Sequence, residues 1–154
     1  AVVGGPPDNP LHQQRLEGVR AAGKARGRLR QLSIVPGDFS VESGHAAVMA
    51  LLDGTPVPTA VFCFSDQMAL GALAACRDRG IRVPEALSIV GFDDLASSRY
   101  LTPPLTTIRQ PMREIGERAV NLLLAIIEQV DVPLQQTLDF SVMLRGSTAP
   151  PKGR

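Results

Sequence analysis

Polar side chains follow two apolar runs of the sequence, at the points where two strands would end. The pair Ser65-Asp66 comes directly after the run Ala60–Phe64, and the pair Asp93-Asp94 ends the run Leu87–Phe92. A segment with helical spacing joins the two runs, which outlines a β-α-β unit. In open α/β sheets, ligands bind outside the carboxyl ends of the strands. The carboxylates and the hydroxyl at these strand ends therefore indicate a site for a small molecule at this edge of the sheet.

The same alternation of strand and helix covers most of the chain. Apolar strands without a polar alternation indicate a sheet that is covered on both faces. The sequence therefore predicts an α/β fold, a parallel sheet with helices on both faces. The predicted strands are Ala1–Val3, Leu32–Val35, Ala60–Phe64, Leu87–Phe92, Leu105–Ile108 and Leu138–Leu144, and the predicted helices are 11–25, 41–52, 66–79 and 112–128.

The loops at the strand ends should meet at one edge of this sheet. Right-handed crossovers place all the loops that follow parallel strands on the same side. The polar and aromatic residues in these loops are Asp8, Asn9, Asp38, Phe39, Ser65, Asp66, Asp93 and Asp94. His12 and His45 show no pattern of partners, and we expect both at the surface.

Charge and composition exclude several classes of protein. The formal net charge is +1, so the chain as a whole has no electrostatic preference for nucleic acid or membranes. A hydrophobic content of 44% with 20% charged residues is typical of a globular protein. The locally basic run Gly23–Arg30 is interpreted as a solvated helix end and loop, with a contact surface as the alternative.

Neither the two cysteines nor the chain ends show a pattern for a metal site, a targeting signal or a membrane span. Cys63 and Cys76 lack metal-ligand spacing, so we expect no metal site and interpret both as small core residues of a reducing compartment. No signal peptide or membrane-spanning run is evident. The chain opens on a strand-like segment without an initiator methionine, and we interpret it as a fragment of a longer protein.

The helix predicted at Met112–Glu128 is apolar on several sides. Burying one leucine or isoleucine stabilises a fold by roughly 1.5–3 kcal/mol, so exposing several would cost on the order of 10 kcal/mol. We therefore expect this helix to cover a hydrophobic surface, either on this unit or on one outside the chain.

Four motifs, in order, resemble signatures of the LacI/GalR (lac-repressor-like) transcriptional regulators. The first is PTAVFCFSDQMALGA at Pro58–Ala72. The second is Val83-Pro84 followed by LSIVGFDD at Leu87–Asp94. The third is PPLTTIRQP at Pro103–Pro111, and the fourth is LRGST at Leu144–Thr148. Together they span the interval from Pro58 to Thr148, more than half of the chain.

This resemblance implies one lobe of a two-lobed effector-binding fold, similar to the periplasmic binding proteins. Residues 1–109 would form the second lobe. Residues 110–137 would be a crossover helix that belongs to a first lobe outside this chain. Residues 138–147 would be a return strand, and 148–154 a tail. The resemblance also implies an N-terminal helix-turn-helix, absent from this chain, that binds operator DNA.

The resemblance further implies a site for a sugar-like ligand. Arg15 would hold two ligand oxygens with its planar fork of donors. Asp93 would accept hydrogen bonds from ligand hydroxyls, and Phe39 would stack on the ligand. Ser65 departs from the family pattern, so it either contacts the ligand or only caps the next helix. Asp8 lies at the same edge, in a variable loop.

The helix Asp66–Arg79 resembles the helix that pairs two subunits in this family. An apolar patch for such a homodimer would consist of Met68, Ala72, Ala75 and Cys76, with Tyr100 and Leu101 nearby. Packing inside the lobe is the alternative for some of these residues.

The resemblance thus implies the ligand-sensing domain of a cytoplasmic repressor that responds to a sugar or a related small metabolite. A periplasmic sugar-binding transport protein is the alternative. We expect neither an enzyme nor a cofactor, because no Gly-rich phosphate loop, nucleophile elbow or catalytic histidine is evident. Ligand binding would act by shifting the population of lobe arrangements.

Overall fold

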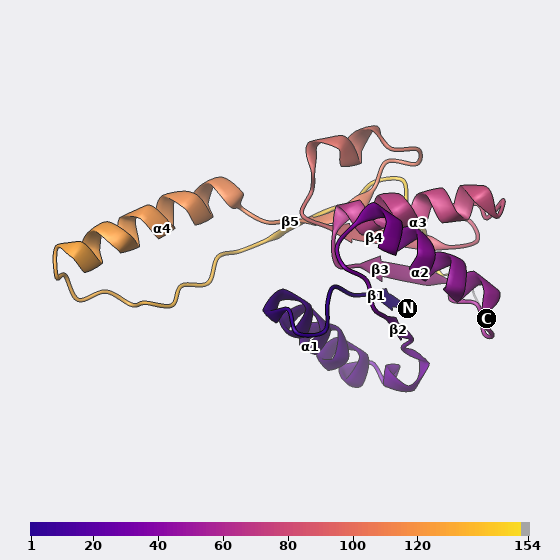
Figure 1. Ribbon diagram of the computed structural model, residues 1–154, viewed down its shortest axis with the longest axis horizontal. Helices are drawn as coiled ribbons and strands as arrows, with labels where there is room; N and C mark the ends of the chain where they lie inside the picture. Colours follow the sequence, from indigo (N-terminus) through magenta and orange to yellow (C-terminus); the bar gives the residue numbers. More distant parts are fainter. Residues whose placement is uncertain (152–154) are drawn as a thin grey trace.

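A six-stranded sheet organises residues 1–151, the part of the chain that the computed structural model describes (Figure 1). Its strand order is β2-β1-β3-β4-β5-β6. Strands β1 to β5 are parallel, and β6 runs antiparallel to β5. The strands are β1 (Val2–Val3), β2 (Ile34–Val35), β3 (Ala60–Cys63), β4 (Ser88–Phe92), β5 (Thr106–Arg109) and β6 (Ser141–Met143).

Three of the four α-helices lie on the faces of the sheet, with both faces covered as the sequence predicts, and the fourth, α4 (Met112–Ile127), does not (Figure 1). The other three are α1 (Pro10–Ala25), α2 (Val41–Asp53) and α3 (Asp66–Asp78), and there are short 3₁₀ helices η1 (Leu29–Gln31) and η2 (Ala96–Tyr100). The chain moves from β1 to β2 in one direction and then to β3 and β4 in the other. Right-handed crossovers therefore place α1 on the face opposite α2 and α3 (Figure 1). The direction changes between β1 and β3, which is where such sheets bind ligands.

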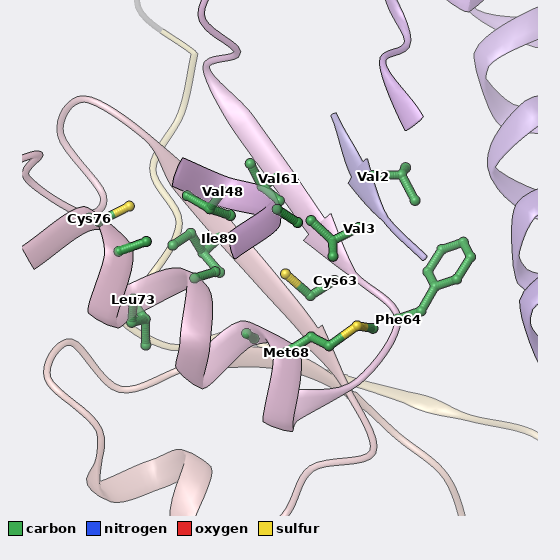
Figure 2. Close-up of a cluster of buried hydrophobic side chains, with 14 of the residues drawn as sticks. Val2, Val3, Val48, Val61, Cys63, Phe64, Met68, Leu73, Cys76 and Ile89 are labelled. Carbon is green, nitrogen blue, oxygen red and sulfur yellow. The ribbon is translucent and has the colours of Figure 1, made fainter. Parts of the chain in front are cut away.

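The core of the lobe lies between the sheet and the pair α2–α3 (Figure 2). Met68 and Cys76 of α3 and Val48 of α2 are completely or almost completely buried against the strand residues Val61 and Cys63. Each buried apolar side chain of this size stabilises the fold by roughly 1.5–3 kcal/mol. This packing fixes where α3 begins, at the carboxyl edge of β3.

Two glycines allow α2 and α3 to pack closely. A Cβ atom at Gly44 would overlap the carbonyl oxygen of Met68, and one at Gly71 would overlap the carbonyl oxygen of Val41. The two helix backbones therefore come closer than any side chain would permit.

Helix α4 extends away from the sheet (Figure 1). Its apolar side chains are exposed over several turns, and so are neighbours in the segment that returns to β6. The most exposed are Met112, Val120, Leu123, Ile127, Leu134 and Phe140. None of the helices in residues 1–151 is long and apolar enough to cross a membrane.

The observed elements differ from the predicted ones mainly in the length of two strands. Strand β2 starts at Ile34 rather than Leu32, because η1 precedes it. Strand β6 is limited to Ser141–Met143, which pair with the last residues of β5; the flanking residues of 138–144 are not in the strand. Of the predicted tail, residues 152–154 lie outside the described part of the chain.

Candidate functional site

Arg15 reaches the carboxyl edge of the sheet from α1. The helix begins with Pro10 after Asn9, whose side chain accepts a hydrogen bond of 2.8 Å from the backbone N–H of Leu11. The Arg15 guanidinium donates to the carbonyl oxygen of Phe64, at the end of β3. It also lies 3.8 Å from the centre of the Phe92 ring, a favourable cation–π distance. Its orientation is therefore fixed before any ligand arrives.

Asp93 faces this guanidinium from the end of β4. Its φ of 116° is uncommon for a residue with a side chain. A hydrogen bond of 2.9 Å from its N–H to the carbonyl oxygen of Ile108 helps to hold this conformation. Its Oδ1 lies 3.9 Å from Arg15 Nη2 and accepts a hydrogen bond of 2.8 Å from Gln110 Nε2. The side chain is 32% exposed, which leaves it accessible to ligand hydroxyls.

Burial changes the acidity of both charged groups. It raises the pKa of Asp93, and the nearby Arg15 charge and the Gln110 hydrogen bond act in the opposite direction. Burial also lowers the pKa of Arg15, against the attraction of Asp93. Each group therefore favours the other's charged state, and a ligand with neutral hydroxyls would interact with both charges.

Four of the five predicted ligand-binding residues line one open cavity of about 520 Å³. These four are Arg15, Phe39, Ser65 and Asp93. Its other lining residues are Leu11, Gln67, Leu95, Gln110, Met112 and Ile115. The combination offers a fork of donors, a carboxylate, an amide and an aromatic face, which suits a small ligand rich in hydroxyls.

Phe39 takes its place in the cavity through a tight turn before α2. Its φ is 70°, and its ring lies against Gly5, where a Cβ atom would overlap the ring. Asp38 Oδ1 accepts a hydrogen bond of 2.9 Å from the backbone N–H of Ser40, and Ser40 in turn caps α2. The turn therefore determines where the aromatic ring can stack.

The hydrogen bonds of Asp38 should make the stability of the lobe depend on pH in the acid range. Hydrogen bonds from Ser40 and Ser43 lower the pKa of Asp38 from 3.8 to about 2. The stabilisation they provide is complete above pH 3.8 and is lost as the pH falls towards about 2. We expect Asp38→Asn to flatten the fall in unfolding free energy over this interval, measured by urea unfolding at a series of pH values. An unchanged pH dependence in the variant would contradict the assignment.

Ser65 caps α3 and lines the cavity. Its Oγ accepts a hydrogen bond of 3.1 Å from the backbone N–H of Met68, and the residue is only 6% exposed. A ligand contact at Ser65 stays a prediction. Asp8, in contrast, is exposed and is not among the residues that line the cavity.

The structure corrects the predicted dimer patch. Met68, Ala72, Ala75 and Cys76 are at most 1% exposed and belong to the core of the lobe, so they cannot form a surface for a second subunit. The predicted helical spacing is right, but this face of α3 points inward. Leu70 lies on the outward face, and Tyr100 is 80% exposed in η2. Leu101 is partly buried against the core.

The prediction for His12 is also wrong. His12 is buried against Gly4 and Phe64, because α1 packs its first turn on the end of β1. His45 is partly exposed and lies 3.0 Å from Asp78 across the α2–α3 pair.

Sequence reasoning missed the buried carboxylate of Asp66. It is 2% exposed and accepts hydrogen bonds from the Leu95 N–H (2.8 Å) and from the hydroxyls of Ser98 and Thr107. Gly91 leaves room for it, since a Cβ atom there would overlap Asp66 Oδ1. The buried carboxylate of Asp66 therefore holds the loop that follows Asp93, through its bonds to Leu95 and Ser98. Among residues 1–151, no three His, Cys, Asp or Glu side chains form a possible metal site.

A protein family described as periplasmic binding protein-like domain matches residues 1–148. The transcriptional repressor CytR of Escherichia coli K12 is 43% identical over 148 residues, 95% of this chain and 43% of that protein. The repressor PurR of Actinobacillus pleuropneumoniae serotype 5b is 42% identical over 141 residues, 90% of this chain and 42% of that protein. Both are named HTH-type transcriptional repressors.

Solved structures of the same kind share the fold. A dimeric lac repressor superposes with a TM-score of 0.91 at 35% identity, over 98% of this chain and 55% of that one. A complex of the transcriptional regulator CelR with cellobiose gives a TM-score of 0.87 at 36% identity, over 96% and 46% of the two chains. The chain belongs to the periplasmic-binding-protein-like family and corresponds to part of a LacI/GalR effector-binding domain.

This part of a LacI/GalR domain spans less than half the length of the curated relatives named above, 43% and 42%. The family resemblance and the fold expected from the sequence are confirmed.

Proposed function

We propose that this chain is the effector-sensing part of a transcriptional repressor that responds to a sugar or a related hydroxyl-rich metabolite. The observation that carries the proposal is the convergence of Arg15, Asp93 and Phe39 on one cavity at the switch point of the sheet. Arg15 would hold two ligand oxygens, Asp93 would accept from hydroxyls, and Phe39 would stack on the apolar face of the ligand. Ser65 would contribute its hydroxyl at the rim.

The first lobe, outside this chain, would complete the cavity from the side of α4. A hollow of about 630 Å³, lined largely by apolar residues, lies between the lobe and α4, with Phe92, Leu122 and Phe140 among its lining. The exposed side chains of α4 would be buried against this first lobe. Residues 110–137 would therefore be a crossover that belongs to the first lobe, and residues 138–147 would be the strand that returns to the second lobe. The ligand would then favour one arrangement of the two lobes over another.

The remaining partners follow from the same assignment. Two copies would pair through surfaces near the outward face of α3 and Tyr100, and helix-turn-helix segments outside this chain would bind operator DNA in the cytoplasm. The repressors named above favour this regulator over a periplasmic transport protein, which shares the fold. They also favour it over an enzyme.

The test uses the complete protein that contains this chain. DNA selected from a random pool provides the operator, and fluorescence anisotropy measures its affinity with and without mono- and disaccharides and ribonucleosides. These compounds carry the vicinal hydroxyls that Asp93 and Arg15 would recognise. At least one should change operator affinity by about 5–150-fold, the usual range of such coupling. Absence of specific DNA binding, or of any response to the whole panel, would contradict the proposal.

A further inference from the structure

Two segments connect the lobe to the part of the chain that contains α4. The outgoing segment leaves at Arg109, the last residue of β5, and continues through Gln110. The incoming segment forms β6, pairs with β5 and reaches Arg145 (Figure 1). Any change in the position of α4 relative to the lobe must pass through these two segments.

One buried carboxylate is bonded to both segments. Asp94 is 4% exposed at its side chain. Its Oδ2 lies 2.6 Å from Arg109 Nε on the outgoing segment, and its Oδ1 lies 2.5 Å from Arg145 Nη2 on the incoming one. Arg145 is itself anchored by a hydrogen bond of 2.8 Å to the carbonyl oxygen of Leu105. The carboxylate therefore joins two segments that are far apart in the sequence.

Its neighbour, Asp93, faces the candidate cavity. Asp93 and Asp94 both have positive φ, at 116° and 53°, so their side chains are held in a fixed relation at the strand end. Asp93 Oδ1 accepts from Gln110 Nε2 at 2.8 Å, directly beside Arg109. A ligand hydroxyl that binds Asp93 would compete with Gln110 for this carboxylate. The carboxylate of Asp93 would therefore contact the ligand in the cavity and also Gln110 on the outgoing segment.

We propose that Asp94 is a positioning residue that clamps the two connecting segments, so that ligand contact at Asp93 is conveyed to both of them together. The part that concerns the ligand rests on the proposed function. The clamp itself does not, because it concerns contacts within this chain. The expected signature is a loss of coupling between ligand and DNA without a matching loss of ligand affinity.

The clamp is tested first without any ligand, by amide hydrogen exchange in the complete protein. Asp94→Asn keeps the shape of the side chain but presents an amide donor to one guanidinium. We expect exchange to rise together in residues 109–110 and 141–145 by about tenfold, which corresponds to about 1.4 kcal/mol. Asp53→Asn, which removes the surface partner of Arg79, is the matched control and should leave both segments unchanged. No change in either segment, or a change in one alone, would overturn the clamp.

A milder variant covers the case in which Asp94→Asn does not fold. Arg109 is 45% exposed at its side chain, so Arg109→Gln should be tolerated. It removes one arm of the clamp and leaves the contact between Asp94 and Arg145. Exchange should then rise mainly in residues 109–110. An unchanged rate there would also overturn the proposal.

The second measurement uses the complete protein with its selected DNA and the most effective compound of the sugar and ribonucleoside panel. Asp94→Asn should bind that compound within about threefold of the unaltered protein, while the ligand's effect on DNA affinity should fall about tenfold. A loss of ligand affinity as large as the loss of coupling, or an unchanged coupling, would count against the clamp. If the unaltered protein responds to no compound, the proposed function fails, and the exchange measurement still decides the clamp.

Discussion

Replacing Arg15 by alanine should abolish the response of the complete protein to its effector while leaving the lobe folded. The guanidinium is held by the Phe64 carbonyl and the Phe92 ring and points at Asp93, so its donors are oriented before a ligand binds. Hydrogen bonds to charged groups contribute about 1.5–3 kcal/mol each, and Arg15 can make two of them. We expect ligand affinity to fall at least about a hundredfold, measured by calorimetry with the compound found in the operator assay.

Arg20→Ala is the matched control for this experiment. Arg20 lies on the same helix, is exposed, and forms no ion pair within residues 1–151. It should leave both ligand affinity and DNA affinity unchanged. Arg15→Lys separates charge from geometry, because an ammonium group cannot hold two oxygens in one plane. If Arg15→Ala keeps its ligand affinity within about threefold, the site assignment is wrong.

Gly71→Ala should strongly destabilise the lobe, although the substitution adds only a methyl group. Because the added Cβ atom would overlap the backbone carbonyl of Val41, α2 and α3 would have to separate and expose part of their shared core. Overpacking of this kind costs about 1–3 kcal/mol, and a clash with backbone belongs at the upper end. Urea unfolding followed by far-UV circular dichroism should therefore show a clearly lower midpoint.

Gly18→Ala in α1 makes the same chemical change in open space. Nothing lies within 4 Å of a Cβ atom at that position. Since alanine favours helix over glycine by about 0.5–1 kcal/mol, the midpoint should stay the same or rise. Equal destabilisation by both substitutions would show that the close approach of α2 and α3 is not what Gly71 provides.

The order of elements could be predicted because local signals mark each boundary. Ser40 and Ser65 cap α2 and α3 as their side chains predict, and Gly80 follows α3 with a φ of 65°. The predicted ends of strands were less accurate. Strand β6 consists of the three residues that pair with Thr107–Arg109 of β5, and a pairing between segments so far apart in the sequence has no local pattern.

The site could be predicted only in part. Strand-end position and family resemblance point to Arg15, Phe39, Ser65 and Asp93, and the structure places them around one cavity. Asp8 is not part of it, because Asn9 caps α1 and Asp8 stays in solvent. A family resemblance indicates which residue types occupy the site. It does not indicate where a loop side chain points, because that depends on residues that are distant in the sequence.

The incorrect dimer patch and the missed carboxylate of Asp66 show why local patterns are insufficient. Spacing identifies which residues share a face of α3, but not which face is buried, and both faces carry apolar residues. Met68 and Cys76 therefore fit a predicted surface although they lie in the core. A carboxylate in a first turn, such as Asp66, has the same local pattern whether it meets water or buried hydroxyls. Its partners Ser98 and Thr107 lie 32 and 41 residues away in the sequence.

Asp66 has a further consequence for how new specificities could arise. Its hydrogen bonds hold the loop from Leu95 to Ser98 without using any atom of Phe39 or Ser65. The groups that face a ligand can therefore be exchanged while the scaffold beneath them stays in place. Asparagine or aspartate at position 65 would still cap α3 and would offer a ligand different chemistry. If the proposed function holds, the ligand specificity of the cavity could therefore be changed by substitutions at positions such as 39 and 65 without altering the buried contacts of Asp66.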